Sequence, residues 1–288
     1  VREGGTLVLN ADDERLAALP QHPKVSSKER TLVYFGMNPN SLVIQEHLAR
    51  GGIAFVAHRG WIELRSRNEV TRIVDAEEVP ATLRGTADFQ IYNILAATAA
   101  CHAYGMDLER IADGLLSYRM DEDSEGRLNL YSVGGAFTLV DYGHNPAALR
   151  AVCSMIAKWR PVKSTGIITV PGDRSDELIA ESARAAACGF DYVIIREDED
   201  LRGRAPGEVA NIIAQTFRQE EPELPVEIIL DELNALSTAL DRLMPGELVV
   251  AFCDQTSEVK RILEERGARP AKAFHHAPPV RMEQVPAA

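Results

Sequence analysis

The residues best equipped for chemistry in this chain stand together in the run Asp141-Tyr142-Gly143-His144-Asn145-Pro146. An apolar run, 136–140, comes before them and an amphipathic run, 147–159, comes after them. This pattern predicts a strand, a tight polar turn and a helix. The turn places Asp141 and His144 at the carboxyl end of a strand, which is where open α/β sheets bind ligands. A carboxylate and an imidazole at that position can hold a ribose, a phosphate or an attacking amine.

The same turn also has a purely structural explanation. Asn145 can cap the following helix by accepting a hydrogen bond from a free backbone N–H, and Pro146 suits the first helical position. Capping turns of this kind are common, so the spacing alone leaves a ligand site and an empty capped turn equally open.

Two further loops that follow predicted strands are rich in ionisable side chains. Residues 171–177 carry Asp173 and Arg174 at the start of a helix, where an anion can be held by backbone N–H groups and an arginine fork. Residues 196–204 contain four consecutive acidic residues, 197–200, which are followed by two arginines, Arg202 and Arg204. Acids facing a cation and an arginine facing a carboxylate suit a zwitterionic, charged amino acid. Helix capping gives no reason for every one of these loops to be charged, which favours a functional site.

The candidate substrate-binding residues in the turn and the two loops are Asn145, Asp173, Arg174, Asp198, Asp200 and Arg202. Because the carboxyl ends of parallel strands meet at one edge of a sheet, we expect the clusters 141–146, 172–177 and 197–204 to converge on one cleft. We also expect that cleft to face the helix that carries Asn93.

The composition is that of an ordinary soluble protein, with 288 residues, 45% hydrophobic and 26% charged. A net charge of −12 argues against non-specific binding to nucleic acid, which requires a basic face. No apolar run is long enough to cross a membrane and none stands at the start as a secretory signal would, so we expect a cytoplasmic protein. The four cysteines, Cys101, Cys153, Cys188 and Cys253, are scattered and form no Cys-x-x-Cys pair. We therefore predict that they are reduced thiols and that they bind no metal.

Strand and helix patterns alternate along the chain, which indicates an α/β protein. In residues 1–120 they predict strands at 6–9, 31–35, 53–57, 60–64 and 70–74, and helices at 14–18, 41–49, 86–104 and 108–116. In residues 121–267 they predict strands at 128–132, 136–140, 165–170, 192–196, 226–230 and 247–252, and helices from 145 and at 176–188, 206–217, 233–243 and 257–266. These later units predict a doubly wound, mainly parallel sheet.

The charged, glycine-ended stretch 121–126 reads as a connector, and we place a domain boundary there. Residues 268–288 are predicted to be a partly ordered tail. At the other end, the apolar strand at 6–9 is suited to burial on both faces and needs neighbours on each side. We therefore expect that an amino-terminal portion of the protein is missing from this sequence.

Several motifs resemble those of the muramyl (Mur) ligase superfamily, which also includes folylpolyglutamate synthases. Residues 10–13, Asn-Ala-Asp-Asp, are similar to its Asn-x-Asp-Asp strand end, and 141–146 to its Asp-Tyr-Ala-His-Asn-Pro motif. Gly126-Arg127 resembles its linker arginine, and 172–174 matches its Gly-Asp-Arg loop. The helix around 88–97 resembles the helix whose asparagine contacts adenine, although Phe89-Gln90 stands where His-Asn is usual. The resemblance implies the end of a P-loop-type central domain, 1–120, followed by a Rossmann-like carboxy-terminal domain, 121–267.

Within the superfamily, residues 34–39, 171–174 and 196–208 resemble the cyanophycin synthetase family. That resemblance implies an ATP-dependent acid–amino-acid ligase that adds L-arginine to the β-carboxylate of a poly-aspartate backbone through an acyl phosphate. The implied partners are ATP, arginine and an acidic polymer acceptor, with no nucleic acid and no membrane, and the enzyme is a possible homo-oligomer.

The resemblance also implies roles for individual residues. Asn93 would contact adenine, Arg127 the phosphates, as a catalytic residue, and Asp141 the ribose. His144 would be catalytic if it orients or deprotonates the amine, and it could equally be a strut of the turn. No Gly-x-x-x-x-Gly-Lys-Ser/Thr loop occurs in this sequence, so the ligands of Mg²⁺ and the remaining phosphate contacts are expected in the missing amino-terminal part. We expect the chain to be inactive without that part.

Two alternatives remain open at the level of the sequence. The first is another Mur-type amino-acid ligase, of the cell-wall or folylpolyglutamate kind, with an acceptor other than arginine. The second is a non-catalytic module that binds a nucleotide or a partner. A dinucleotide-binding domain is disfavoured, because no Gly-x-Gly-x-x-Gly follows any predicted strand.

Overall fold

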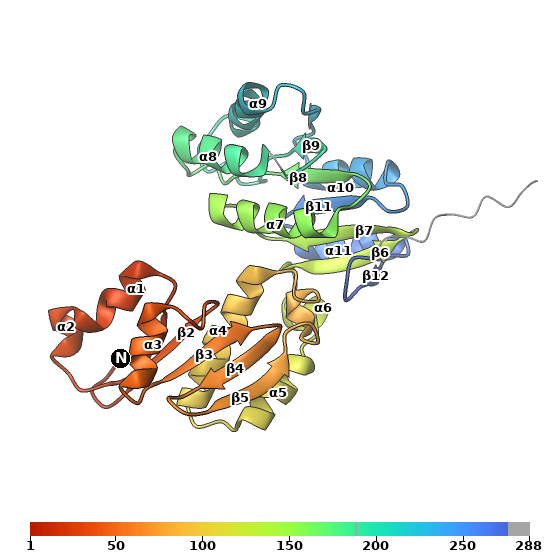
Figure 1. Ribbon diagram of the computed structural model, residues 1–288. Coiled ribbons are helices and arrows are strands. Elements are labelled where there is room, and N and C mark those ends of the chain that lie inside the picture. The colour runs from red at the N-terminus through yellow and green to blue at the C-terminus, as the bar shows by residue number, and fades with distance from the viewer. Residues whose placement is uncertain (188, 276–288) are drawn as a thin grey trace, which may run out of the picture. The chain divides into compact units, whose positions relative to one another are not determined.

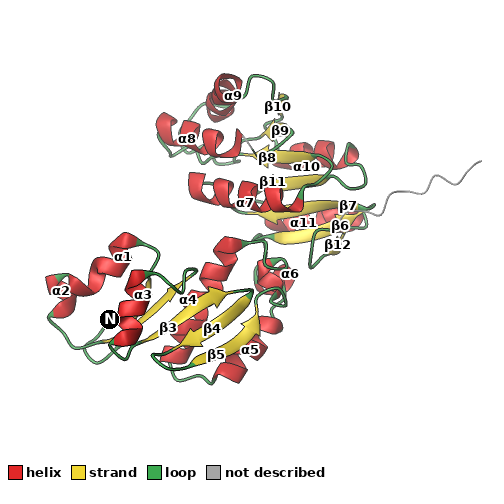
Figure 2. Ribbon diagram, viewed as in Figure 1, coloured by secondary structure: helices red, strands yellow, loops and turns green. Residues whose placement is uncertain are grey.

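The computed structural model describes residues 1–187 and 189–275, which form two compact units, Val1–Arg119 and, from Met120 onward, a second (Figure 1). Each unit is built around its own β-sheet (Figure 2). The unit boundary comes just before the charged connector 121–126, whose first residues belong to a short helix, α6 (Met120–Asp123).

Unit 1 has a sheet in the order β1-β2-β3-β4-β5. The first three strands are parallel and the last two are added as antiparallel hairpins. The strands are β1 (Thr6–Asn10), β2 (Thr31–Gly36), β3 (Ile53–His58), β4 (Trp61–Arg65) and β5 (Val70–Asp75). The helices are α1 (Glu14–Ala18), η1 (Leu19–Gln21), α2 (Pro23–Ser26), α3 (Leu42–Ala49), η2 (Pro80–Thr82), α4 (Asp88–Ala103) and α5 (Leu108–Leu116).

Both faces of the unit 1 sheet are covered. On one face, Phe55 and Ile62 pack with Ile91 and Leu95 of α4. The other face packs against α3, whose Ile44 is fully buried. This two-sided burial explains why the first strands are continuously apolar rather than alternating.

Unit 2 has a sheet in the order β10-β9-β8-β11-β7-β6-β12. The pairs from β10 through β7 are parallel, and β6 and β12 extend the sheet in antiparallel fashion. The strands are β6 (Asn129–Val133), β7 (Ala136–Asp141), β8 (Ser164–Ile168), β9 (Tyr192–Ile195), β10 (Val226–Ile228), β11 (Leu248–Phe252) and β12 (Arg269–Pro270). The helices are α7 (Pro146–Trp159), α8 (Asp176–Ala187), α9 (Glu208–Glu220), α10 (Glu232–Asp241) and α11 (Thr256–Glu265).

Helices cover both faces of the unit 2 sheet, with α7, α8 and α9 on one face and α10 and α11 on the other (Figure 1). Leu236 and Val259 pack on Val140, Ile167 and Val249 of the central strands. The predicted doubly wound, mainly parallel α/β sheet is thereby confirmed. The sheet brings the carboxyl ends of β7, β8, β9 and β11 to the same edge.

The predicted elements differ from the structure mainly at their ends. The helix predicted from Pro206 begins at Glu208, because Gly207 takes a left-handed conformation at φ 83° immediately before it. The predicted strand 165–170 ends at Ile168. The predicted helix 176–188 is described as far as Ala187, because residue 188 lies outside the described residues.

The first part of the predicted tail is integrated into unit 2. Arg269 and Pro270 pair with Ser132 and Tyr131 of β6. Phe274 then stacks on Trp159, with ring centroids 5.4 Å apart and an interplanar angle of 4°. Residues 276–288 of the predicted tail lie outside the described residues.

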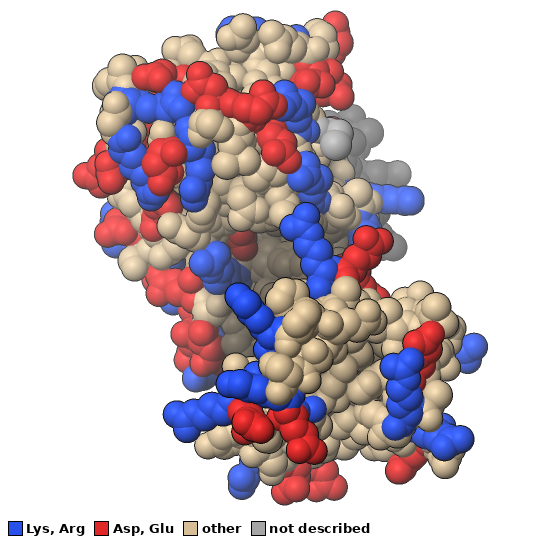
Figure 3. Space-filling model, turned by 90° about the vertical axis from the view of Figure 1, so that its left-hand side faces the viewer, with Lys and Arg blue, Asp and Glu red and all other residues tan. Residues whose placement is uncertain are grey.

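Charge is distributed without separation on the visible surface of unit 2, where basic and acidic side chains stand next to one another (Figure 3). Ion pairs in this unit include Arg150–Glu181 and Arg184–Glu177. In residues 1–187 and 189–275, every helix is too short or too polar to traverse a lipid bilayer.

Candidate functional site

The turn after β7 is organised by the carboxylate of Asp141, which is 8% exposed. One oxygen accepts a hydrogen bond from Gly143 N at 2.6 Å, and the other accepts from Leu128 N at 3.0 Å. Leu128 stands at φ 53°, a left-handed conformation that is costly for a branched side chain. Asp141 therefore connects the turn to the segment just before β6. This contact also keeps Arg127, the residue before Leu128, near Asp141.

Burial raises the pKa of Asp141 above its ordinary value, although its two backbone hydrogen bonds and the nearby Arg127 oppose that rise. Desolvation thus outweighs the favourable contacts of the charged form.

The Tyr142 ring contacts two polar side chains, those of Arg127 and His144. The guanidinium of Arg127 lies 4.8 Å from the centre of the Tyr142 ring, and the ring of His144 meets Tyr142 edge-on at 4.9 Å. His144 Nδ1 lies 2.8 Å from the carbonyl oxygen of Tyr142. Because a carbonyl can only accept, Nδ1 is the protonated nitrogen, and the lone pair of a neutral His144 is on Nε2. Asn145 caps α7 by accepting from Ala148 N at 3.0 Å, as the sequence predicts.

A cavity of about 500 Å³ lies beside this turn. It is strongly acidic, and it is lined by Tyr142, Asp198, Glu199, Asp200, Arg202, Glu232, Asp254 and Gln255. The lining residues come from the loops after β7, β9 and β11 and from the start of α10. Of the three predicted clusters, 197–204 supplies four lining residues and 141–146 supplies one, Tyr142, whereas no residue of 172–177 lines this cavity.

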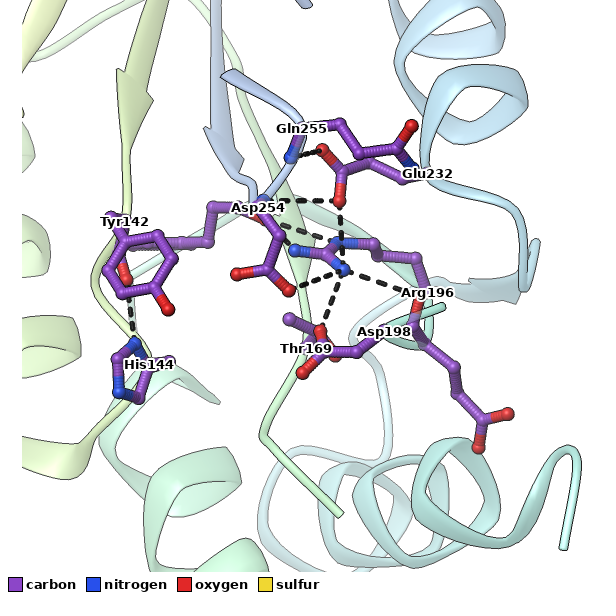
Figure 4. Close-up of polar contacts among 10 residues, drawn as sticks. Tyr142, His144, Thr169, Arg196, Asp198, Glu232, Asp254 and Gln255 are labelled. Carbon is purple, nitrogen blue, oxygen red and sulfur yellow. Dashed lines mark hydrogen bonds and ion pairs between the residues drawn. The ribbon is translucent and has the colours of Figure 1, made fainter. Parts of the chain in front are cut away.

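Three of the lining carboxylates gather around Arg196, a residue only 1% exposed that directly follows β9 (Figure 4). Its Nε and Nη2 donate to the carbonyl oxygen of Phe252 at 3.2 and 2.9 Å. Its Nη1 lies 2.8 Å from Asp198 and 2.9 Å from Glu232. Arg196 thus joins the ends of β9 and β11 to the first turn of α10.

The carboxylate of Asp198 accepts from Thr169 Oγ1 at 3.2 Å as well as from Arg196. Burial raises the pKa of Asp198, Arg196 opposes the rise, and the adjacent Asp254 adds to it. Three carboxyl groups, those of Asp198, Glu232 and Asp254, thus lie within 4 Å of a single guanidinium nitrogen.

The loop 171–177 is fastened to the third loop by Arg204. This guanidinium donates to the carbonyl oxygens of Gly172 and Arg174 at 2.8 and 2.7 Å and pairs with Asp176 at 2.7 Å. Asp173 also pairs with Arg202 at 3.0 Å.

The remaining predicted residues are placed as follows. Arg174 lies 3.7 Å from Asp173. Asp200 accepts from the backbone N–H of Arg202 at 2.9 Å. Asn93 belongs to unit 1, where its exposed side chain donates to Gln90 at 3.0 Å.

The sequence predictions missed three residues that line the cavity, Glu232, Asp254 and Gln255. They also missed two residues that contact the lining, Thr169 and Arg196. Asp254 and Gln255 follow β11, so the rule that polar residues after parallel strands gather at one edge would have found them. Arg196 follows β9 in the same way, but its burial could not be predicted, because it depends on the distant carbonyl of Phe252.

Within residues 1–187 and 189–275, no group of three or more His, Cys, Asp or Glu side chains is arranged to hold a metal ion.

Residues 126–253 match the family model of the Mur ligase, glutamate ligase domain. The chain is 39% identical to the cyanophycin synthetase of Synechocystis sp. over 92% of its own length, and it spans 30% of that relative. It is 26% identical to the UDP-N-acetylmuramoyl-L-alanyl-D-glutamate–2,6-diaminopimelate ligase of Solibacter usitatus, over 90% of the chain and 48% of the relative. Mycobacterium tuberculosis folylpolyglutamate synthase, solved with ADP and AMPPCP, has the same fold, with a TM-score of 0.58 at 16% identity over 92% of this chain and 64% of that one.

Proposed function

Residues 126–253 form a Mur ligase C-terminal domain within a chain similar to cyanophycin synthetases, and from this premise we propose that the chain is part of an ATP-dependent ligase. The reaction proposed is the joining of an amino acid to a carboxylate by way of an acyl phosphate. The amino acid is L-arginine, and the acceptor is the β-carboxylate of a poly-aspartate backbone. In this proposal, residues 1–120 are the end of the central, nucleotide-binding domain and residues 121–267 are the carboxy-terminal domain.

The observation that carries the proposal is the charge of the cavity. Five carboxylates line it, those of Asp198, Glu199, Asp200, Glu232 and Asp254. Arg202 is the single arginine in the lining. Carboxylates pair with a planar guanidinium through two parallel hydrogen bonds, which a lysine ammonium cannot reproduce. An acidic cavity of about 500 Å³ is large enough for one amino acid of this kind.

Arg202 is the residue proposed to meet the α-carboxylate of the amino acid. Its side chain is 38% exposed and is held by Asp173, while its backbone N–H is held by Asp200. This arrangement places one cation at the rim of an otherwise anionic cavity, which suits a zwitterion entering with its guanidinium first. Asn145 and Arg174 are proposed to complete the substrate contacts at the neighbouring loops.

The nucleotide is proposed to be held by Asn93 in unit 1 and by Arg127 and Asp141 in unit 2. Each oxygen of Asp141 accepts one backbone N–H, and a carboxylate oxygen has a second acceptor position. That position suits a ribose hydroxyl, and the cationic Arg127 beside it suits phosphate oxygens. Mg²⁺, when bound, would offset the charge of those phosphates; we propose that most of its ligands lie outside this chain.

The amine of the incoming amino acid must lose a proton when it attacks the activated carboxylate. His144 Nε2 is the available base, because Nδ1–H is committed to the carbonyl of Tyr142. Tyr142 lines the cavity and its ring contacts the ring of His144, so His144 lies just behind the cavity lining. The tetrahedral adduct then collapses to the amide. His144 could instead only support the Tyr142 ring, through the same contact between the two rings. Kinetic measurements on a His144 variant distinguish this structural role from a role as the base.

An acceptor panel tests the proposal. The complete ligase, with ATP and a poly-aspartate primer, is offered L-arginine, L-lysine, L-citrulline and diaminopimelate, and ADP release is measured. We expect the kcat/KM for arginine to be at least about a hundredfold above that for citrulline. Citrulline has no positive charge, so it cannot form the charge-assisted hydrogen bonds that arginine forms with the carboxylates.

Other outcomes of this panel assign other functions. Preference for diaminopimelate would assign the chain to the cell-wall ligases, to which it is also similar. ADP release with none of the amino acids, and binding of ATP alone, would point to a non-catalytic nucleotide-binding module.

A further inference from the structure

Three carboxylates surround one nitrogen of a buried arginine in unit 2. Nη1 of Arg196 lies 2.8 Å from Asp198, 2.9 Å from Glu232 and 3.7 Å from Asp254 (Figure 4). These carboxylates come from the loop after β9, the start of α10 and the loop after β11. One cation is therefore shared by three anions.

Arg196 itself is committed to the protein. It is 1% exposed, and both Nε and Nη2 donate to the carbonyl of Phe252, so its fork points inward and cannot swing into the cavity. Glu232 is fixed equally well, because its two oxygens accept from the backbone N–H groups of Asp254 and Gln255. Arg196 and Glu232 are thus a fixed frame, and Asp254, at 39% exposure, is the most exposed of the three carboxylates around it.

The balance of charge around this frame is negative from every side. The groups that face it are Asp198, Glu199, Asp200 and Arg202 from the loop after β9, Tyr142 from the loop after β7, Glu232 from α10, and Cys253 and Asp254 from the loop after β11. Buried anions in excess of their counter-ions require either a proton or another cation. Because Asp198 and Asp254 are adjacent, a proton taken up there belongs to the pair rather than to one residue.

We propose that Arg196 is a positioning residue that supplies one of the positive charges this cluster requires, and that a proton and the substrate's cationic side chain compete to supply another. This inference rests on the proposed function and deepens it. Substrate binding then expels a proton, and Arg196 sets the pH at which the cavity accepts its substrate. A guanidinium that enters the cavity completes the neutralisation that Arg196 begins.

The direction of the pH effect follows from the contacts. Burial and Asp254 raise the pKa of Asp198 above its ordinary value, and Arg196 holds it down. Affinity for a cationic substrate is therefore full above that raised pKa and falls as the pH drops through it. Removing the charge of Arg196 raises the pKa of the pair further, so the loss of affinity begins at a higher pH.

Two substitutions of Arg196 separate charge from geometry. Arg196→Met removes the cation, and we expect the KM for L-arginine at neutral pH to rise at least about tenfold while kcat changes little. The fall in affinity should also begin at a higher pH than in the unaltered enzyme. Arg196→Lys keeps the charge but loses the fork that reaches Phe252. It should raise the KM less and leave the pH of the fall near that of the unaltered enzyme.

The experiment measures ADP release by the complete ligase at varied L-arginine concentration over a pH series. Calorimetric titration with L-arginine in buffers of different ionisation enthalpy counts the protons released on binding. Arg261→Met and Arg261→Lys are matched controls, because Arg261 lies on α11, is 60% exposed and pairs with Glu265 of the same helix. Circular dichroism checks that each variant is folded.

If Arg196→Met does not fold, Asp198→Asn and Arg196→Lys decide the matter. Asp198→Asn removes one titrating carboxyl, so the pH dependence of KM and the proton release should both diminish. Unchanged pH dependence in Asp198→Asn, or in a folded Arg196→Met, overturns the inference and leaves the proposed function intact. Absence of arginine-dependent ADP release by the unaltered ligase overturns the proposed function, and this inference with it.

Discussion

At the scale of single residues, Gly172 is a point of close contact between the second and third charged loops of unit 2. A Cβ atom at this position would overlap the backbone carbonyl oxygen of Leu201. Since that neighbour is backbone, relief would require one loop to move. The loops are also joined there by Arg204, which donates to the carbonyl of Gly172.

Replacing Gly172 by alanine should therefore separate the two loops. We expect the variant to lose on the order of 1–3 kcal/mol of unfolding free energy, as overpacked sites do. Affinity for the amino-acid substrate should weaken as well, because Arg202 and Asp173 stand on the displaced segments. Chemical denaturation of the chain measures the first effect and KM in the complete ligase the second.

Gly114→Ala is the control for this substitution. Gly114 lies within helix α5, and a Cβ there meets nothing within 4 Å, so the change should be neutral or slightly stabilising. Equal stability of Gly172→Ala and the unaltered chain would show that the loops have slack at this point.

At the scale of elements, the segment after α11 belongs to the core of unit 2. Residues 269–270 add an edge strand, β12, to β6. Phe274 then packs between Trp159 of α7 and Phe137 of β7, with centroid distances of 5.4 and 4.8 Å. This short stretch therefore fastens the antiparallel edge of the sheet to a helix.

Phe274→Ala should lower the unfolding free energy of unit 2 by on the order of 2 kcal/mol, less than the roughly 3–5 kcal/mol of a fully buried phenylalanine because Phe274 is only partly buried. Thermal unfolding and the fluorescence of Trp159 would report the loss. Lys272→Ala, at an exposed neighbouring position, should leave both unchanged. If both variants melt alike, the aromatic stack contributes nothing to stability.

The helices and strands were predictable from the sequence wherever local pattern decides them. The strands at 6–10 and 31–36 are continuous apolar runs, and the helix 108–116 repeats its apolar residues with helical period. β12 was not predictable, because its strand character comes only from pairing with β6. The paired residues Ser132 and Arg269 are 137 positions apart in the sequence. Asp141 and Asp198 were identified from their place after strands, whereas Arg196 looked like the exposed start of a charged loop.

At the scale of the whole molecule, the chain is divided into two units with separate sheets. Hydrophobic clusters of the described residues follow this division, since Phe55 and Leu95 pack within unit 1 and Val249 and Leu263 within unit 2. The candidate nucleotide contacts are divided in the same way, with Asn93 in unit 1 and Arg127 and Asp141 in unit 2. Neither unit alone carries every contact that the proposed reaction needs.

This division predicts the behaviour of the chain by itself. The sequence contains no Gly-x-x-x-x-Gly-Lys-Ser/Thr loop to cradle the β- and γ-phosphates, and phosphoryl transfer depends on positioning those groups. We therefore expect the 288-residue chain to release no ADP from ATP in the presence of L-arginine and poly-aspartate, under conditions in which the complete ligase is active. L-Arginine should still bind the chain, because the acidic cavity is formed entirely by unit 2. A coupled ADP assay and calorimetry measure the two properties separately, and turnover by the chain alone would mean that it holds a phosphate-binding device of another kind.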